Sequence, residues 1–121
     1  MSINTAVPSR LWNMIDRKNA GGGSMDSLAW LQNWYAKQCD GEWEHTNGVR
    51  IDTLDNPGWS VKIDLSDTRY KGLESAIIVD DYVSDSDWIV CRIVDGNFDG
   101  SGDPQKLLPI VQKFRGWIDN F

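Results

Sequence analysis

The residues whose types could do chemistry are most concentrated in one short stretch, Asp40-Gly-Glu-Trp-Glu-His45. Carboxylates beside the only histidine of the chain could hold a divalent metal ion or form an acid/base pair, and in an enzyme the catalytic groups would be Asp40, Glu44 and His45. The spacing matches no metal-binding motif, such as His-Glu-x-x-His, so we expect no metal ion, no cofactor and no catalytic residue. The simpler interpretation is an acidic loop whose Trp43 packs on the body of the domain while His45 makes a structural hydrogen bond.

Two other stretches offer weaker chemistry. The run Asp95-Gly-Asn-Phe-Asp-Gly-Ser-Gly-Asp103 resembles a calcium-binding loop, but the twelfth position, where a glutamate would close the loop, is Lys106. We therefore expect a glycine-rich turn over residues 95–102. Cys91 lies in an apolar run and is expected to be a small buried hydrophobe rather than a nucleophile. Because Cys39 is the only other cysteine, we expect a reduced, cytoplasmic protein, although one disulfide stays open.

The elements that position these residues follow from hydrophobic periodicity and predict an α+β fold. Residues 27–38 are expected to form a helix capped by Asp26 or Ser27. Asp103-Pro104 is expected to open a last, amphipathic helix, whose first turn Pro109 would kink or detach. The strands are expected at residues 49–54, 59–65, 76–79 (extending towards 83) and 88–94. This order predicts a four-stranded antiparallel meander sheet flanked by an N-terminal and a C-terminal helix.

The tract Gly21-Gly-Gly-Ser24, followed directly by Met25, divides the chain. A Gly/Ser tract of this kind is a flexible tether, and a methionine after it is typical of the start of a second, separately encoded protein. We therefore predict an artificial fusion of two sequences. It consists of a partner peptide at residues 1–20, a linker at residues 21–24 and a domain at residues 25–121.

The N-terminal peptide has the features of a recognition segment, because an apolar face is flanked by basic residues. The candidate anchors are Arg10, Leu11, Trp12, Ile15 and Arg17. A segment this short is marginal as an isolated helix, so we expect it to become helical when it docks in a groove. Addition of an extended strand to a sheet edge is the alternative, especially for residues 2–7.

Charge also separates the two parts. Residues 1–24 carry a net charge of +2, which leaves −8 for residues 25–121 because the whole chain carries −6. A basic peptide and an acidic domain are complementary, whereas nucleic acid needs a surface rich in Lys and Arg. The sequence contains no apolar run long enough to cross a membrane. We therefore expect a peptide or protein partner, no nucleic acid and no membrane, with the peptide docked on its own domain or on a neighbouring molecule.

Four tryptophan-rich strings resemble the immunity protein 53 family of bacterial polymorphic toxin systems. They are Leu31-Gln-Asn-Trp-Tyr35, Gln38-Cys-Asp-Gly-Glu-Trp-Glu-His45, Asp55-Asn-Pro-Gly-Trp59 and Asp87-Trp-Ile-Val-Cys91. The resemblance covers most of residues 25–121 and none of residues 1–24. It implies a small cytoplasmic α+β protein that protects its producer by binding a cognate toxin. A polar motif of the family is expected to fall on a loop, which implies a partner-binding surface made of Asp40, Glu42, Trp43, Glu44 and His45.

Two classes of function follow. The leading hypothesis is a binding protein of the immunity protein 53 type that takes a basic, amphipathic peptide or toxin segment, here tethered as residues 2–20. The alternative is an enzyme or substrate-recognition component that acts on a short ribosomally made peptide, with residues 2–20 as its substrate. In a third interpretation, residues 1–24 only aid solubility or crystallisation.

Overall fold

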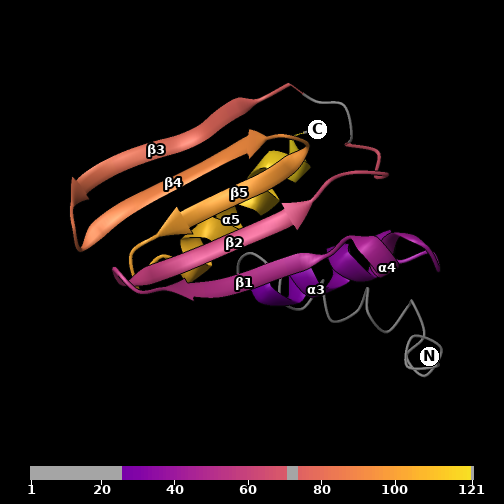
Figure 1. The fold of residues 1–121 in the computed structure, drawn as a ribbon, viewed down its shortest axis with the longest axis horizontal. Coiled ribbons are helices and arrows are strands. Elements are labelled where there is room, and N and C mark those ends of the chain that lie inside the picture. The colour runs from indigo at the N-terminus through magenta and orange to yellow at the C-terminus, as the bar shows by residue number, and fades with distance from the viewer. Residues whose placement is uncertain (1–25, 71–73, 121) are drawn as a thin grey trace.

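The computed structural model describes residues 26–70 and 74–120 as a sheet with helices behind it (Figure 1). The strands are β1 (Val49–Leu54), β2 (Gly58–Asp64), β3 (Ala76–Ser84), β4 (Asp87–Val94) and β5 (Asn97–Gly102). The helices are α3 (Ser27–Gln38), α4 (Trp43–Thr46) and α5 (Leu107–Asp119). Helix α5 packs against β2, β3, β4 and β5, and α3 packs on α5. The predicted α+β class is therefore confirmed.

The sheet has five antiparallel strands in the order β1-β2-β5-β4-β3, so the predicted four-stranded meander is wrong. The missed strand is β5, which lies between β2 and β4 (Figure 1). Only Asp95 and Gly96 of the expected glycine-rich turn form a turn, with φ angles of +53° and +77°. The next six residues continue as a strand that joins the two halves of the sheet.

The glycines of β5 have a packing role rather than a turn role. A Cβ atom added to Gly100 would lie 2.6 Å from Cγ2 of Ile110, and one added to Gly102 would lie 2.6 Å from Cβ of Lys106. Phe98, on the same side of the strand, is fully buried. Glycine in this strand therefore allows α5 and the segment before it to approach the sheet closely.

The last helix begins later than predicted. Residues 103–106 form a separate turn, in which the amide of Lys106 donates to the carbonyl of Asp103 at 3.0 Å, and α5 starts at Leu107. The N-cap is Lys106, so the prediction that Asp103 caps this helix is wrong. Pro109 is the third residue of α5. An N–H group at this position would have no partner inside the helix, so the donor that proline lacks is not missed there. The turn before Leu107 is separate from the helix, as predicted.

The first helix matches its predicted bounds. The carboxylate of Asp26 accepts a hydrogen bond from the amide of Leu28 at 3.0 Å and so caps α3. Its buried face holds Leu31 and Trp34, whereas the Leu28 side chain is 62 % exposed. Trp34 belongs to the core because α3 packs on α5 rather than on the sheet, where the Trp34 ring contacts the ring of Phe114.

The two faces of the sheet differ in burial. Val61, Ile63 and Cys91 point towards the helices and are fully buried. Their sequence neighbours Lys62 and Arg92 are exposed on the opposite side, which no helix of the described residues covers (Figure 1). We call this side the open face. None of the described helices, of which α5 is the longest with 13 residues, is long and apolar enough to cross a membrane.

Candidate partner-binding surface

The acidic segment, which we define as residues 40–46, is a folded turn rather than the expected loop, because residues 43–46 form the short helix α4. One oxygen of Asp40 accepts hydrogen bonds from the amides of Glu42 (3.0 Å) and Trp43 (2.9 Å). The carboxylate of Glu44 accepts from the amides of Gly41 (2.9 Å) and Asp40 (3.0 Å). These two carboxylates therefore satisfy the backbone donors at the start of α4.

Backbone hydrogen bonds lower the pKa of both carboxyl groups. For Asp40 the main cause is the amide of Trp43, and for Glu44 it is the amide of Glu44 itself. A carboxylate that already accepts backbone hydrogen bonds is poorly suited to take a proton from a substrate at neutral pH. Within residues 26–70 and 74–120, no three His, Cys, Asp or Glu side chains are grouped so that they could hold a metal ion.

The predicted partner-binding residues of the acidic segment do not share one surface. Trp43 is only 3 % exposed and lies in the core, where its Nε1 donates to the carbonyl of Ser66 at 2.9 Å. The packing of Trp43 on the domain is therefore confirmed. Glu42 and His45 are exposed, and neither side chain has a hydrogen-bond partner among the described residues, so the expected structural hydrogen bond of His45 is not found there. Glu42 and His45 are the exposed members of the segment whose side chains are not engaged with its backbone.

A second acidic region lies on the edge strand β3. Asp80 pairs in register with Val90 and Asp81 with Ile89, so the two aspartates project from opposite faces of the sheet. Both are exposed, and neither carboxylate has a hydrogen-bond or ion-pair partner among the described residues. These carboxylates therefore keep their full capacity for an outside partner.

The aspartates of β3 are interleaved with exposed apolar side chains. Ile77 is 71 % exposed, Tyr82 63 % and Val83 68 %, and these are the three most exposed of the large hydrophobic residues in the described part. A cluster of apolar side chains left in solvent beside charged groups is typical of an interaction surface. Asp80 shares the open face with Ile77 and Tyr82, whereas Asp81 projects from the helix side of the same edge strand. We call Ile77, Asp80, Asp81, Tyr82 and Val83, which surround the free edge of the sheet on both faces, the β3 patch.

Tyr82 has a local partner that orients its ring. Its hydroxyl donates to the carboxylate of Asp85 in the turn between β3 and β4, and this hydrogen bond raises the pKa of Tyr82. Tyr82 also pairs in register with Trp88 across the hairpin. The aromatic ring is therefore held at the end of the β3 patch in its neutral form.

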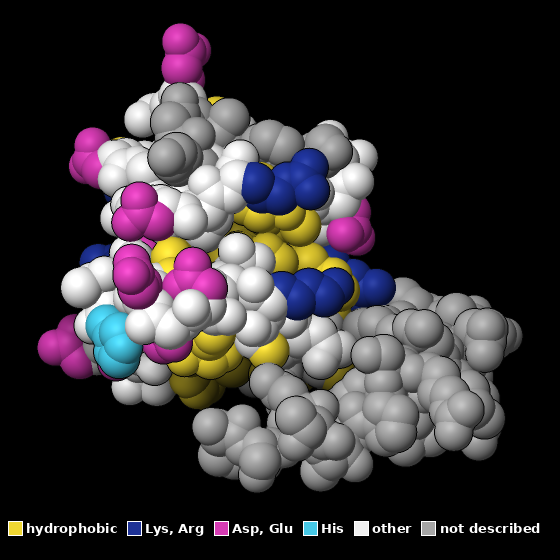
Figure 2. Space-filling view, turned by 90° about the vertical axis from the view of Figure 1, so that its right-hand side faces the viewer, with side chains coloured by type: hydrophobic (Ala, Val, Ile, Leu, Met, Phe, Trp, Pro, Cys, Tyr) yellow, Lys and Arg dark blue, Asp and Glu magenta, His cyan; other side chains and the backbone are white. Residues whose placement is uncertain are grey.

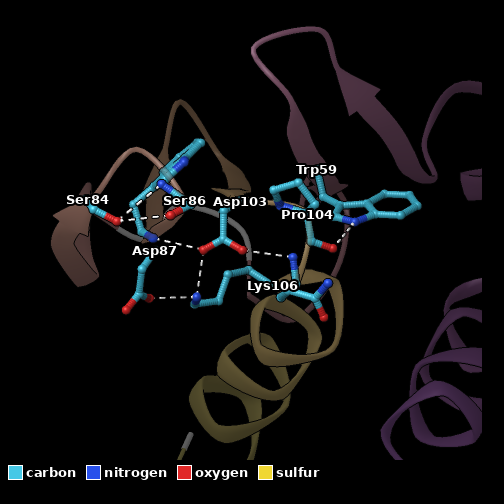
Figure 3. Close-up of polar contacts among 9 residues, drawn as sticks. Trp59, Ser84, Ser86, Asp87, Asp103, Pro104 and Lys106 are labelled. Atoms are coloured by element: carbon cyan, nitrogen blue, oxygen red, sulfur yellow. Dashed lines mark hydrogen bonds and ion pairs between the residues drawn. The ribbon is translucent and has the colours of Figure 1, made fainter.

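A buried carboxylate fixes the end of the hairpin that carries the patch (Figure 3). One oxygen of Asp103 accepts from the amide of Trp88 at 2.8 Å and from Nζ of Lys106 at 2.6 Å. Its other oxygen accepts from the amide of Gln105 at 2.8 Å. Lys106 also donates to Asp87 at 2.9 Å. This Asp103 network ties the start of β4, the end of β5 and the start of α5 together.

The charge of Asp103 is neutralised by Lys106, which Asp87 contacts as well. The hydrogen bond from Lys106 is the main cause that lowers the pKa of Asp103 to about 2, and the same contact is the main cause that raises the pKa of Lys106. Asp103 is completely buried, so its charge needs this partner. Trp59 adds a neutral link, because its Nε1 donates to the carbonyl of Pro104 at 2.9 Å (Figure 3).

The cysteines take no part in a site. Cys91 points into the core, where burial raises the pKa of its thiol to about 12. It is therefore a protonated core residue at neutral pH, as the sequence predicts. Both cysteines are free thiols, which excludes the disulfide that the sequence leaves open.

The β3 patch was missed as a site by sequence reasoning, although a signal for it exists. Residues 74–91 contain five acidic residues and no Lys or Arg, in a chain where both charge signs are otherwise mixed. Figure 2 views the molecule from the right-hand side of Figure 1, away from the β3–β4 turn; on that side Asp and Glu side chains lie mainly on the left, around the histidine, while Lys and Arg side chains flank a hydrophobic area at the centre. The predicted peptide anchors (Arg10, Leu11, Trp12, Ile15 and Arg17) lie outside the described residues.

Comparison with known proteins assigns the family. The model of the family described as immunity protein 53 matches residues 28–119, which include all five strands and the helices α4 and α5 in full, and all of α3 except Ser27. No curated protein and no solved structure matches the chain. Because the match covers most of the chain, the protein belongs to the immunity protein 53 family.

Proposed function

We propose that the domain neutralises a toxin by binding a basic, amphipathic segment of it on the β3 patch, and that residues 2–20 are such a segment in tethered form. The observation that carries this proposal is the pair of unpartnered carboxylates, Asp80 and Asp81, among apolar side chains that are left in solvent. Family membership supports a toxin as the partner.

The chemistry of the two surfaces is complementary. The apolar anchors of the peptide, Leu11, Trp12 and Ile15, would cover Ile77 and Tyr82 and remove their apolar surface from water. Its basic anchors, Arg10 and Arg17, would face the β3 aspartates, which favours encounter and register. Tryptophan and arginine are also the residue types most enriched at binding hot spots.

The acidic segment contributes a second, smaller contact in this proposal. Glu42 and His45 are its exposed members and would meet the partner directly. Asp40, Trp43 and Glu44 would act indirectly, because their side chains fold the turn that presents these two. Exchange of both exposed side chains, Glu42→Gln with His45→Gln, is expected to weaken binding by less than any change in the β3 patch.

Titration calorimetry of peptide 2–20 into residues 25–121 tests the proposal. The domain is suitable because, among the residues that the structure describes, the buried hydrophobic side chains all lie between Leu31 and Ile118. The double variant D80N/D81N is expected to bind about two- to thirtyfold more weakly, since each exposed charge pair contributes about 0.2–1 kcal/mol. Added salt should weaken the unmodified domain more than this variant.

A matched control separates local contact from overall charge. The double variant D52N/D55N removes the same number of charges from β1 and the turn after it, at the opposite edge of the sheet. It should bind as tightly as the unmodified domain. If both double variants bind the peptide more weakly by the same factor, the attraction comes from the overall charge of the domain and not from contact with the β3 patch. If the unmodified domain gives no heat of binding, the proposal is refuted.

The apolar part of the contact has its own matched pair of variants. Ile77→Thr removes an apolar group from β3, and Ile51→Thr removes the same group from the other edge strand, where Ile51 is 40 % exposed. Loss of peptide affinity for the first variant alone is the expected result. Loss of peptide affinity for Ile51→Thr alone would instead place the binding surface on β1.

A further inference from the structure

We propose that the partner is held by strand addition, with residues 2–7 of the chain (Ser2-Ile-Asn-Thr-Ala-Val7) lying along the free edge of β3 as a sixth strand in the same molecule. This inference rests on the function proposed above and specifies how the partner is bound. In this arrangement backbone hydrogen bonds give affinity and the side chains of the β3 patch give selectivity.

The free edge of β3 is suited to this role. Among the described residues β3 pairs only with β4, so one row of its N–H and C=O groups faces away from the sheet. The strand has nine residues, against six in the other edge strand, β1. Between its two register shifts, the residues Val79 to Tyr82 pair with β4 without interruption and form a regular template.

The charges on β3 select which strand can join. Asp80 is the central residue of the nine, so an antiparallel second copy of β3 would place Asp80 opposite Asp80. Like charges directly opposite each other destabilise a pair of strands, and charged residues on an edge are a common device against self-association. The edge is therefore closed to another copy of itself and open to an uncharged or basic strand.

Residues 2–7 match these requirements. They contain no charged residue, and the β-branched residues Ile3, Thr5 and Val7 alternate along them as in a strand. Pro8 then removes a backbone donor, which ends the added strand, and Arg10 follows with a positive charge.

The chain is long enough for this docking. Residues 8–25 lie between Val7 and Asp26, the first residue of the described part. When extended, these eighteen residues span about 60 Å at roughly 3.3 Å per residue. A five-stranded sheet is only about 19 Å wide at roughly 4.8 Å between neighbouring strands, so a tether of this length can reach β3, and extra tether length lowers the local concentration only slowly.

Proline scanning of the full chain, read by hydrogen exchange of the β3 amides in dilute solution, tests the inference. In the unmodified chain, the amides of β3 that point away from β4 should exchange about tenfold more slowly than in a free edge when the docked form outnumbers the free form ten to one. In a strand only every second N–H points at its neighbour. Asn4→Pro and Ala6→Pro should therefore have the same effect on the protection of the β3 amides, either loss or retention, and Thr5→Pro should have the opposite effect. Gly22→Pro, in the linker, is the control that should change nothing.

Each outcome decides the matter. Alternating loss and retention of protection supports strand addition. Loss with all three prolines supports a helix or another compact conformation of the segment and overturns the inference. Fast exchange in the unmodified chain also overturns it, and the charges of β3 then only prevent self-association. If the calorimetric titration still shows binding that depends on Asp80 and Asp81, the proposed function survives that result with a different binding mode; if it shows none, both proposals fall.

Discussion

The acidic segment and the β3 patch are both rich in carboxylates, but they use them in opposite ways. In the acidic segment, Asp40 and Glu44 accept hydrogen bonds from backbone amides and hold a single turn of helix together. In the β3 patch, Asp80 and Asp81 project into solvent without a partner among the described residues. A run of Asp and Glu residues in a sequence therefore does not by itself indicate a binding site, because hydrogen-bond donors within the protein can already engage each carboxylate.

Removal of the Trp43 side chain should have the largest effect on stability, and it should disrupt the acidic segment while leaving the β3 patch unchanged. Trp43→Ala empties a buried aromatic site and is expected to lower the free energy of unfolding by about 3–5 kcal/mol. Trp43→Phe keeps most of the packing but leaves the carbonyl of Ser66 without its donor, which should cost about 1–3 kcal/mol. Urea denaturation measures both. Affinity for peptide 2–20, corrected for the folded fraction, should fall no further than in the double variant of Glu42 and His45, the two residues that this turn presents; a larger loss would place Trp43 in the binding surface.

The Asp103 network should produce the next largest effect, and it depends on pH. The pKa of Asp103 is about 2 in the folded protein and 3.8 for an ordinary aspartate, so the folded state binds its proton less readily. The carboxylate therefore contributes stability that is fully present above about pH 4 and is lost as the pH falls towards 2. Thermal melting between pH 2 and pH 5 should show this loss, and Asp103→Asn should be less stable at pH 5 and flatter with pH. Parallel pH curves for the two proteins would assign the acid sensitivity to other carboxyl groups.

Single neutralisations in the two acidic regions should give the smallest and most informative difference. Asp40→Asn weakens the hydrogen bonds that the amides of Glu42 and Trp43 donate to this side chain, and is expected to lower the melting temperature slightly while leaving peptide affinity unchanged. Asp80→Asn removes only a solvent-exposed charge, so stability should stay within about 0.5 kcal/mol while affinity falls. Thermal melts and calorimetry on the same samples provide the comparison. If both variants lose stability and neither loses affinity, the contrast between the two regions is wrong.

Much of the fold follows from hydrophobic pattern, because that pattern records burial. The alternation in β2 and the spacing in α3 lead to the correct strand and helix bounds within one or two residues. The hydrophobic pattern does not predict β5, because Gly100 and Gly102 are typical of a turn. In the structure their small size allows α5 and the residue before it to approach the strand closely. No local pattern contains that information, since Ile110 and Lys106, the residues that approach the glycines, belong to the next element.

The site was less predictable than the fold for a related reason. The acidic segment attracts attention because polar and aromatic residues are dense there, yet Trp43 is a core residue and Asp40 accepts hydrogen bonds from backbone amides of its own turn. The β3 patch shows itself only when the strand is known to be an edge, because the same residues in a central strand would be buried. Edge position depends on the insertion of β5 beside β2, which the sequence analysis did not predict.

The placement of β5 also sets the order in which the domain can be completed during synthesis. β1 pairs with β2 and β3 with β4 through neighbours in sequence, but β2 can join the rest only when Gly102 reaches Trp59. Before that moment β2 and β4 each have an edge of unpaired backbone N–H and C=O groups, and α5 has not yet been made to cover their apolar inner face. Such late, non-local pairing slows folding and leaves a nascent chain open to aggregation. Truncation before residue 97 should therefore yield two unjoined hairpins rather than a smaller domain.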